Sequence, residues 1–546
     1  MIAVWLAFSL TFGLTTSFSC PDIVKQSCQC FTIYDNYARN EARHYVNCSS
    51  RDLRAMPYMD FKTGTRIHEL LLQNNSITSL SSENFSRKVH IRYIDISTNP
   101  FVYDLEKKVL KNNIVGLKIV IARAIGLNLN NISALSFVKD LHVLEELDIS
   151  RNLEYVVSMM PPLFIENNLY ALKKLSISLC RLQDINAHSF IGLNNLRELD
   201  LSSNYLNKVP RALKRLSLLR RLNLRLNDIT VIYHGDFKEL RCLEELDLSR
   251  NLLGQIEAFR NGAFLGMENS LTHLTIQGAD IPLIPSKSFS NLKRLKSLDV
   301  SQNKITFMNS SSFLGRYNLE NLDISDNPWL FDNDMFQGLQ ASLTSLSMRK
   351  IGVSFMPTLP LQKLTKLLRL DMSYNRISTL TNDSLTGIHA RIMNFSNNKI
   401  RHISPQAFSH YRLPIAIDLS HNAIETLDFV FESRPCTIYT LNISGNGFLC
   451  DCQMEKLINS KRVEQLSGTC IVGDKSVDLL NQTVVTEMER YCGRSERTLC
   501  FWWVPKSKAS PTTYRNTVLI IFMIFIQGLQ IIDFSCTYLY VCTSVL

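Results

Sequence analysis

Residues 196–206 read Leu-Arg-Glu-Leu-Asp-Leu-Ser-Ser-Asn-Tyr-Leu, and this spacing of apolar residues and asparagine decides the fold. The same template, L-x-x-L-x-L-x-x-N-x-L, returns at 243–251 and at 367–377. Counted from the first apolar position, sixteen units begin at Ile67, Ile91, Ile114, Leu144, Leu172, Leu196, Leu219, Leu243, Leu271, Leu295, Leu319, Leu343, Leu367, Ala390, Pro414 and Ile438. Twelve of the fifteen steps between them are 23 or 24 residues long, so the chain repeats one structural unit.

The template is that of a leucine-rich repeat, and each of its positions has a physical role. Two leucines that lie two residues apart on a short strand point inward, and the residue between them points outward. The asparagine bonds backbone groups where the chain turns away from the strand. One unit has no closed core, so the units must stack. We therefore predict an α/β fold, a leucine-rich-repeat solenoid (horseshoe) with a parallel concave β-sheet.

Some units depart from the template. The third unit has Ala122 in the asparagine position, and the ninth unit has Ala279 there. Both lie next to steps of 28 residues or more, so we predict irregular solenoid structure around residues 114–145 and 251–285. Cys180 also fills an asparagine position, which the template allows, and is expected to be a buried structural thiol.

Cysteines cluster at both ends of the repeat region, at Cys20, Cys28, Cys30 and Cys48 and again at Cys450, Cys452, Cys470 and Cys492. Two disulfides in each set would close that end of the solenoid and shield its apolar surface. Four cysteines allow three pairings, which the sequence does not distinguish. Zinc is the competing interpretation of Cys-x-Cys, but no second Cys-x-x-Cys or paired histidines complete a tetrahedral site. We therefore expect disulfide caps, with no metal and no cofactor, and the roles of Cys242, Cys436 and Cys500 stay open.

The start of the chain predicts secretion. An apolar run from Ile2 to Leu14 ends at Ser17-Phe18-Ser19, a small-x-small pattern that suits signal peptidase, although no basic residue precedes Lys25. Clustered cysteines indicate an oxidising compartment. Nine Asn-x-Ser/Thr sequons lie at Asn47, Asn74, Asn84, Asn131, Asn309, Asn382, Asn394, Asn442 and Asn481. Together these features predict a glycosylated extracellular chain.

The C-terminal end predicts attachment to a membrane. Residues 517–532 contain only two strongly polar side chains, and continuing through Asp533 to Leu546 would supply enough length to span a bilayer. Basic residues precede this segment and none follows it, which reverses the usual positive-inside bias and keeps a lipid-anchor signal or a truncated secreted product as alternatives. We expect a protein of the cell surface, single-pass or lipid-anchored, or else secreted.

The expected organisation is a signal peptide (1–19), an N-terminal cysteine cap (20–66), leucine-rich repeats (67–445, the sixteenth unit at 438–449 merging into the next part), a C-terminal cysteine cap (446–493), a linker (494–516) and a hydrophobic tail (517–546). The net charge is +10, from 59 Lys and Arg against 49 Asp and Glu, without a long basic run, so a nucleic-acid partner is not expected. The sequence contains no Gly-x-Ser-x-Gly, His-Glu-x-x-His or phosphate-binding loop, so we expect a binding protein and no enzyme.

Charged residues mark the predicted concave face. A basic cluster comprises Lys173, Lys174, Arg197, Arg220, Arg221 and Arg225, from three consecutive strands. These residues are the candidate site for an anionic ligand, and pairing with glutamates on adjacent strands is the alternative.

An aspartate also recurs between the two inward leucines, at Asp95, Asp148, Asp200, Asp247, Asp299, Asp323, Asp371 and Asp418. It suggests either a calcium-binding stripe or simply the preference of this repeat class. Asn394 and Asn442 share that position, so glycans there would obstruct the C-terminal part of the face. We therefore expect binding to use the N-terminal and middle repeats.

Repeats of 24 residues with a phenylalanine on the return path, together with both cysteine caps, resemble the ectodomains of Toll-like receptors over residues 20 to about 493. The phenylalanines are Phe190, Phe237, Phe289, Phe313, Phe336 and Phe408. The resemblance implies a horseshoe that recognises microbial or endogenous ligands and dimerises, with Cys450 paired to Cys470 and Cys452 to Cys492. Two departures are the absence of a tryptophan after Cys-x-Cys and of a TIR domain after the tail.

The resemblance implies a receptor, co-receptor or decoy of innate immunity that binds through its repeats. The alternative is an adhesion or developmental leucine-rich-repeat protein, with a lipid anchor. The expected partners are a protein, lipid or glycan ligand, a second leucine-rich-repeat receptor in a homo- or heterodimer, and a membrane through the tail.

Overall fold

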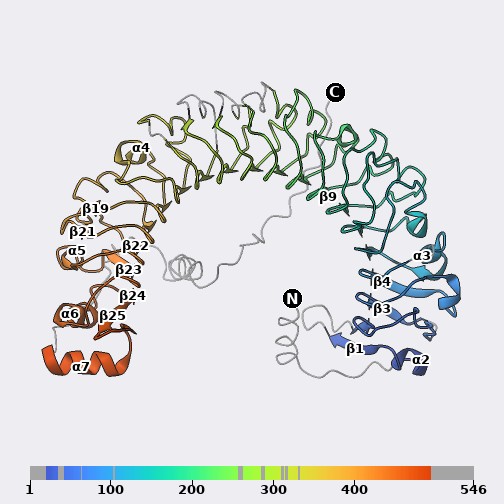
Figure 1. Cartoon of the computed structure of the whole chain (residues 1–546), viewed down its shortest axis with the longest axis horizontal. Helices are drawn as coiled ribbons and strands as arrows, with labels where there is room; N and C mark the ends of the chain where they lie inside the picture. The colour runs from blue at the N-terminus through green and yellow to red at the C-terminus, as the bar shows by residue number, and fades with distance from the viewer. Residues whose placement is uncertain are drawn as a thin grey trace, which may run out of the picture.

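The computed structural model describes residues 20–492 apart from 35–41, 63, 102–104, 256–261, 285–288, 290, 309–312, 314–317 and 330–331. The predicted signal peptide, linker and hydrophobic tail therefore lie outside the described residues, as does Cys500. The described chain forms an open arch, with strands along its inner side and loops and short helices along its outer side (Figure 1).

A 20-stranded sheet lines the concave side. Its strands are β1 (Gln29–Tyr34), β2 (Ala42–Asn47), β3 (Arg66–Leu71), β4 (Val89–Asp95), β5 (Ile114–Val115), β6 (Ile119–Ile121), β7 (Glu146–Asp148), β8 (Lys174–Ser176), β9 (Glu198–Asp200), β10 (Arg221–Asn223), β11 (Glu245–Asp247), β12 (His273–Thr275), β14 (Ser297–Asp299), β16 (Asn321–Asp323), β17 (Ser345–Ser347), β18 (Arg369–Asp371), β20 (Ile392–Asn394), β22 (Ile415–Asp418), β23 (Ile438–Asn442) and β24 (Gln465–Ser467). β1 and β2 are antiparallel, and from β2 onward neighbouring strands are parallel. The predicted fold class is confirmed, with about 17 turns against sixteen predicted units.

Buried asparagines form a ladder where each turn leaves the sheet. Asn204 is 4% exposed, and its Oδ1 accepts hydrogen bonds from the backbone N–H groups of Cys180 and Leu182 at 3.0 and 3.1 Å. Its Nδ2 donates to the carbonyls of Ile177 and Leu201 at 2.9 Å each. The template asparagine therefore joins its own turn to the preceding one.

The third unit begins three residues later than the sequence predicted. Val120 pairs with Leu147, the central leucine of the next strand, so the unit starts at Leu117. Ile125, and not Ala122, occupies the ladder position, because its N–H donates to Asn152 Oδ1 at 3.0 Å. The step from the second unit to the third is therefore 26 residues and the step from the third to the fourth is 27, in place of the predicted 23 and 30.

The irregularity predicted at residues 114–145 is confirmed, whereas the one predicted at 251–285 is wrong for the concave sheet. β4 pairs with both β5 and β6, so the strand is interrupted within 114–145. Across 251–285, β11, β12 and β14 pair in unbroken register. Ala279 does fill a ladder position, since its N–H donates to Asn303 Oδ1 at 2.9 Å, and residues 256–261 lie outside the described residues.

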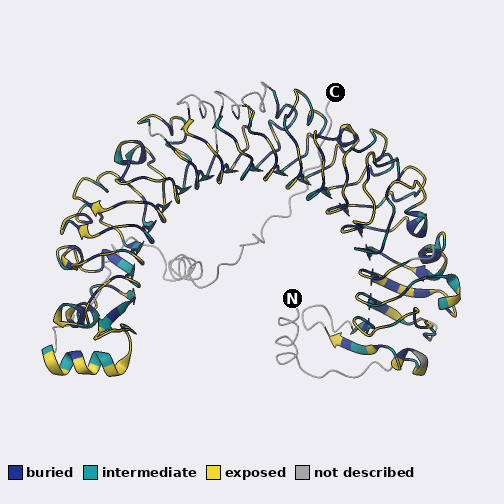
Figure 2. Cartoon of the chain, in the orientation of Figure 1, coloured by how far each residue is buried: buried dark blue, intermediate teal, exposed yellow. Residues whose placement is uncertain are grey.

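The remaining elements are short and lie on the side away from the sheet or in the caps at its two ends (Figure 1). Figure 2 shows buried residues beneath them, most of which are apolar. These elements are α2 (Asp22–Lys25), η1 (Ser82–Asn84), α3 (Val109–Asn113), η2 (Ser136–Val138), η3 (Arg211–Arg215), β13 (Leu283–Ile284), β15 (Phe307–Met308), α4 (Thr358–Gln362), β19 (Thr379–Leu380), β21 (His402–Ile403), α5 (Asp428–Phe431), α6 (Cys452–Ser460), β25 (Thr469–Val472), β26 (Lys475–Asp478) and α7 (Gln482–Cys492). Return-path phenylalanines fill the space between turns: Phe164 and Phe190, for example, are buried with ring centroids 6.2 Å apart. Tilted aromatic contacts of this kind make the core continuous along the arch.

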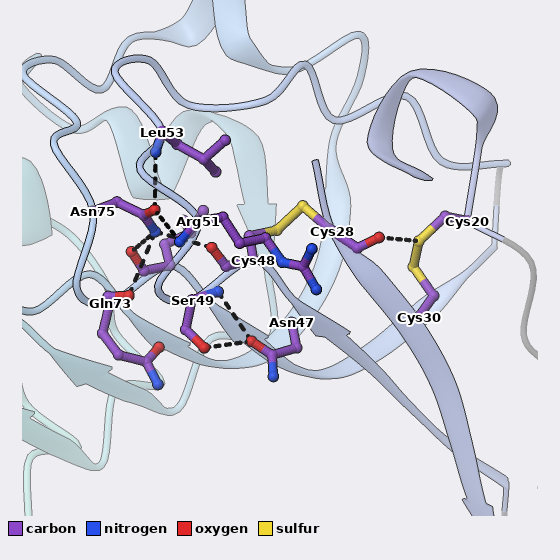
Figure 3. The surroundings of a disulfide bond; sticks show 11 residues. Cys20, Cys28, Cys30, Asn47, Cys48, Ser49, Arg51, Leu53, Gln73 and Asn75 are labelled. Carbon is purple, nitrogen blue, oxygen red and sulfur yellow. Dashed lines mark hydrogen bonds between the residues drawn. A yellow bond between two sulfur atoms is a disulfide. The ribbon is translucent and has the colours of Figure 1, made fainter. Parts of the chain in front are cut away.

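Disulfides close both ends of the sheet. At the N-terminal end, Cys20 pairs with Cys30 and Cys28 with Cys48, beside the first ladder residue, Asn75 (Figure 3). These bonds exclude the zinc interpretation, because a disulfide sulfur is no thiolate ligand.

At the C-terminal end, Cys450 pairs with Cys470 and Cys452 with Cys492, which confirms the pairing that the resemblance implies. Cys436 is also disulfide-bonded. Cys180 is buried as predicted, and burial raises the pKa of its thiol to about 12, which leaves it unreactive.

The expectation of a membrane-attached protein at the cell surface is corrected. Among the residues that the structure describes, no helix is both long and apolar enough to cross a bilayer. The hydrophobic tail at 517–546, on which the expectation rested, lies outside them.

Candidate functional site

Outward-facing side chains of the sheet form rows, because neighbouring strands pair residue against residue. We define the first row by the outward residue at the start of each strand, and its central members are Glu146, Lys174, Glu198, Arg221 and Glu245. The second row lies two residues further on, at the aspartate position. A third row, which we name the approach row, consists of the residue immediately before each strand. Its central members are Lys118, Glu145, Lys173, Arg197, Arg220 and Glu244. All six residues of the basic cluster lie in or beside these rows.

The first row alternates in charge. Lys174 Nζ lies 3.0 Å from Glu146 on the preceding strand. Arg221 pairs with Glu198 on one side and lies 3.9 Å from Glu245 on the other. Each cation is thus neutralised by a neighbouring strand, which is the alternative that the sequence left open.

The approach row also contains paired charges. Glu145 lies between two lysines, 2.5 Å from Lys118 Nζ and 2.8 Å from Lys173 Nζ, and their hydrogen bonds lower its pKa to about 2. It therefore stays ionised in acidic surroundings. Further along the row, Arg220 pairs with Glu244 at 2.8 Å.

Arg197 is the exception in this row. Its side chain is exposed and forms no hydrogen bond or ion pair with any residue that the structure describes. Lys173 and Arg220 flank it on the adjacent strands, and their glutamate partners lie on the far sides. Positive charge is therefore left uncompensated at Arg197, which makes it the strongest point of the cluster for an anionic group.

Arg225 lies apart from the other five cations. It follows the second row, and its Nη1 lies 3.4 Å from Gln277 Oε1, two strands further along. Sequence reasoning missed Lys118 because the third unit was placed out of register. The correct start at Leu117 would have put Lys118 in the approach row beside Glu145.

The recurring aspartates have a structural role. Asp200 Oδ1 accepts a hydrogen bond from the N–H of Ser202 at 2.9 Å, and Asp247 and Asp371 accept the same bond at 2.8 Å. The carboxylates thus fix the turn that follows each strand. Burial raises the pKa of Asp95 and of Asp323. These contacts favour the preference of the repeat class over a calcium-binding stripe.

Sequons lie at both ends of the second row. Strand pairing places Asn47 at its N-terminal end, and Asn394 and Asn442 near its C-terminal end. Each uses Oδ1 to accept the N–H two residues further on, at 3.0, 2.9 and 3.1 Å, while Nδ2 donates to no residue that the structure describes. Around the last two, small side chains such as Ser345 leave a hollow of about 590 Å³. Candidate glycans therefore bracket the middle of the concave face.

The remaining sequons lie off this row. Asn74, Asn131, Asn382 and Asn481 are exposed, and Asn309 lies outside the described residues. Asn84 is half-buried, and both ends of its amide hold the local turn. Its Oδ1 accepts from the N–H of Ser81 at 2.8 Å, and its Nδ2 donates to the carbonyl of Met56 at 3.5 Å.

The leucine rich repeat family matches residues 170–229, 209–253 and 269–328. The fold is the leucine-rich-repeat solenoid. Among curated proteins, the chain is 28% identical to the keratocans of Gallus gallus and of Coturnix japonica over 228 residues, 41% of this chain and 56% of each relative. It thus matches little more than half the length of those leucine-rich-repeat relatives.

Solved structures of the Toll-like receptor type share this leucine-rich-repeat fold. The TLR13–ssRNA13 complex matches with a TM-score of 0.55 at 19% identity, covering 76% of each chain. The mouse RP105/MD-1 complex matches with 0.56 at 16%, covering 74% of this chain and 72% of that one. The Toll–Spatzle complex of Drosophila matches with 0.51 at 15%, covering 83% and 75%. At these identities the likeness establishes the fold alone.

Proposed function

We propose that this leucine-rich-repeat protein is an extracellular recognition protein of the Toll-like type, without enzymatic activity, that binds an anionic ligand on the middle of its concave face. The observation that carries the proposal is the uncompensated Arg197 between Lys173 and Arg220, in a zone bracketed by candidate glycosylation sites. The pairs around it hold the lysine and arginine side chains in place, so less side-chain entropy is lost on binding. Extracellular location is supported by the four cap disulfides.

Similarity in fold supports the class of function. The structures of TLR13, Toll and RP105 are complexes with a single-stranded RNA, with Spatzle and with MD-1 respectively. For this chain we propose a protein, lipid or glycan ligand that carries carboxylate, phosphate or sulfate groups, since guanidinium binds these groups in a bidentate manner.

The Arg197→Glu substitution tests the proposed site. The secreted chain would be screened by biolayer interferometry against acidic lipopeptides, sulfated glycans, acidic proteins and single-stranded RNA. For the ligand found, we expect Arg197→Glu to weaken binding at least about tenfold, because an attractive contact becomes repulsive. Arg376→Glu is the matched control, since Arg376 is also exposed but lies after a ladder asparagine, away from the sheet. Equal affinities for the two variants would place the ligand elsewhere.

Glycan mapping tests the proposed limits of the face. We expect glycans at Asn394 and Asn442, whose Nδ2 groups are not engaged, and little or none at Asn84, whose amide holds a turn. Release with peptide N-glycosidase F in ¹⁸O-water, followed by mass spectrometry, marks each occupied asparagine. If Asn394 and Asn442 carried no glycan, the hollow at β18–β23 would be accessible to a ligand. Binding would then not be restricted to the middle of the arch.

An adhesion or developmental leucine-rich-repeat protein is the second candidate. It is favoured by one observation, that the curated sequence matches are keratocans. Binding of the secreted chain to cell surfaces or extracellular matrix that is unaffected by Arg197→Glu would support this candidate over the first.

A further inference from the structure

A second group of basic residues lies on the outer side of the arch, along the path that the chain takes after β9 (Figure 1). Between Asp200 and Asp228 the sequence contains seven lysine and arginine residues and no acidic residue. Four of these have partners on other turns, Lys208 with Asp184 at 2.8 Å and the others on the concave side as described above. The remaining three lie in η3, and their side chains form no hydrogen bond or ion pair within the described ranges: Arg211, Lys214 and Arg215.

The η3 segment presents these three cations to solvent, because its other face packs on the core. Ala212 and Leu213 are buried, whereas Arg211, Lys214 and Arg215 are exposed. A 3-10 helix has three residues per turn and rises about 2 Å per residue, so Arg211 and Lys214 lie on one face, about 6 Å apart along its axis. Like charges at this separation repel each other and lower the stability of the segment.

The next turn continues the group of cations. The N–H groups of Leu219 and Leu243 each bond the carbonyl three residues back, so the two turns approach their strands along the same path. Counted back from these leucines, Lys214 and Lys238 occupy equivalent positions on adjacent turns. Lys238 is exposed, and the Arg241 side chain is 73% exposed. We name these five residues the outer basic patch: Arg211, Lys214, Arg215, Lys238 and Arg241.

Two acidic residues lie within this surface, and they do not neutralise it. Asp236 is half-buried, and its Oδ2 accepts a hydrogen bond from the Tyr233 N–H at 2.8 Å. Burial raises the pKa of this carboxyl, although the Tyr233 N–H and the charges of Lys214 and Arg211 act in the opposite direction. Glu239 lies 3.9 Å from Arg241. Five cations therefore share two carboxylates, and positive charge remains on the surface.

The outer basic patch departs from the charge pairing found on the concave side. There, Lys174 and Arg221 each lie beside a glutamate of a neighbouring strand. On the outer side, Lys214 and Lys238 place like charges on adjacent turns instead. A repulsion that brings no gain within the folded chain points to a function, and a ligand with several negative charges would supply the gain.

The chemistry of the surroundings favours one class of anionic polymer. The cap disulfides support an extracellular location, and anionic lipids are concentrated in the cytoplasmic leaflet of cell membranes. Sulfated polysaccharides carry sulfate groups along an extended chain, which suits cations that are spread over the surface of two turns. No sequon lies between Asn131 and Asn309, so the sequence provides no N-glycan acceptor on these turns.

We propose that the outer basic patch binds a sulfated glycosaminoglycan and thereby holds this protein at cell surfaces or in the extracellular matrix. The proposal rests on the extracellular location proposed above. It does not depend on the concave ligand, because the patch and Arg197 lie on opposite sides of the turns.

Binding of the secreted full chain to an immobilised heparin octasaccharide, measured by surface plasmon resonance, tests the patch. We expect Lys214→Glu with Lys238→Glu to weaken binding at least about tenfold, because two attractive contacts become repulsive. The melting temperature of this variant should be equal to or above that of the parent, since the repulsion between like charges is removed.

Lys366→Glu with Arg412→Glu is the matched control. Both residues are exposed on later turns, and the change in net charge is the same. This variant should bind the octasaccharide within about twofold of the parent, because charges so far from the patch are screened.

Two further measurements separate this patch from the concave site and identify the ligand chemistry. Arg197→Glu should leave octasaccharide binding within about twofold of the parent, even where it abolishes binding of the concave ligand. Unsulfated heparosan of the same length should bind at least about tenfold more weakly than heparin, because only its carboxylates remain.

Four results would each overturn the proposal. They are a parent that does not bind the octasaccharide, equal losses in the patch variant and its matched control, a loss caused by Arg197→Glu alone, and tighter binding to phosphatidylserine vesicles or to single-stranded RNA than to the octasaccharide.

Discussion

Replacing Asn204 with alanine is expected to destabilise its part of the solenoid by about 3–5 kcal/mol. The substitution removes three hydrogen bonds to the preceding turn and one within the same turn. It leaves two N–H groups and the Ile177 carbonyl without these partners in the core, whereas the Leu201 carbonyl still accepts from Asn227 Nδ2 at 3.1 Å. Because a solenoid is stabilised turn by turn, the loss should be local. Hydrogen exchange should therefore accelerate about a hundredfold or more at the amides of Cys180 and Leu182, and little at distant turns.

Asn207→Ala is the control for this prediction. Asn207 is exposed and lies three residues further along the same turn, so its replacement should change stability by less than about 0.5 kcal/mol. If the Asn204 variant exchanged no faster than the Asn207 variant, the ladder would contribute no net stability. The prediction is read from peptides that cover residues 177–185 in both variants.

Removing the disulfide between Cys452 and Cys492, by serine substitution at both positions, is expected to detach α7 from the C-terminal cap. The bond closes 40 residues, for which loop entropy predicts about 4 kcal/mol. Of the α7 side chains only Met488 is fully buried, while Val484 and Val485 pack partly buried against the core. Glu489 accepts one hydrogen bond from Asn459 of α6 at 3.1 Å, so the contacts that would remain without the disulfide are few. The variant should be secreted poorly, and in any secreted product trypsin should cleave α7 at Arg490.

The control for the cap is Cys180→Ser, which changes a buried cysteine that forms no disulfide. Its hydroxyl can keep the contact that the thiol makes with the Ile149 carbonyl, so the cost should be about 1 kcal/mol. Secretion of the double cap variant at the level of this control, with α7 still protected, would show that packing alone holds the helix.

The amino-acid sequence determined the fold class, the caps and most of the turns of this protein. The reason is local: inward leucines, turn asparagine and step length all lie within one repeat, so the template is visible without knowledge of its neighbours. It failed in the third unit, where Ile114 and Leu117 both fit the first position. Only pairing of Val120 with Leu147 on the next strand separates the two registers.

Tertiary structure decided which side chains face one another across turns. Glu145 meets both Lys118 and Lys173, whereas Arg197 meets no carboxylate that the structure describes, although all four are adjacent in the same row. Likewise, the left-handed backbone of Leu179 (φ 53°) cannot be predicted from the residue type. A repeat template specifies what each turn buries. Charge pairing and outward apolar contacts arise between turns that lie more than 20 residues apart, where only the stacked structure brings them together.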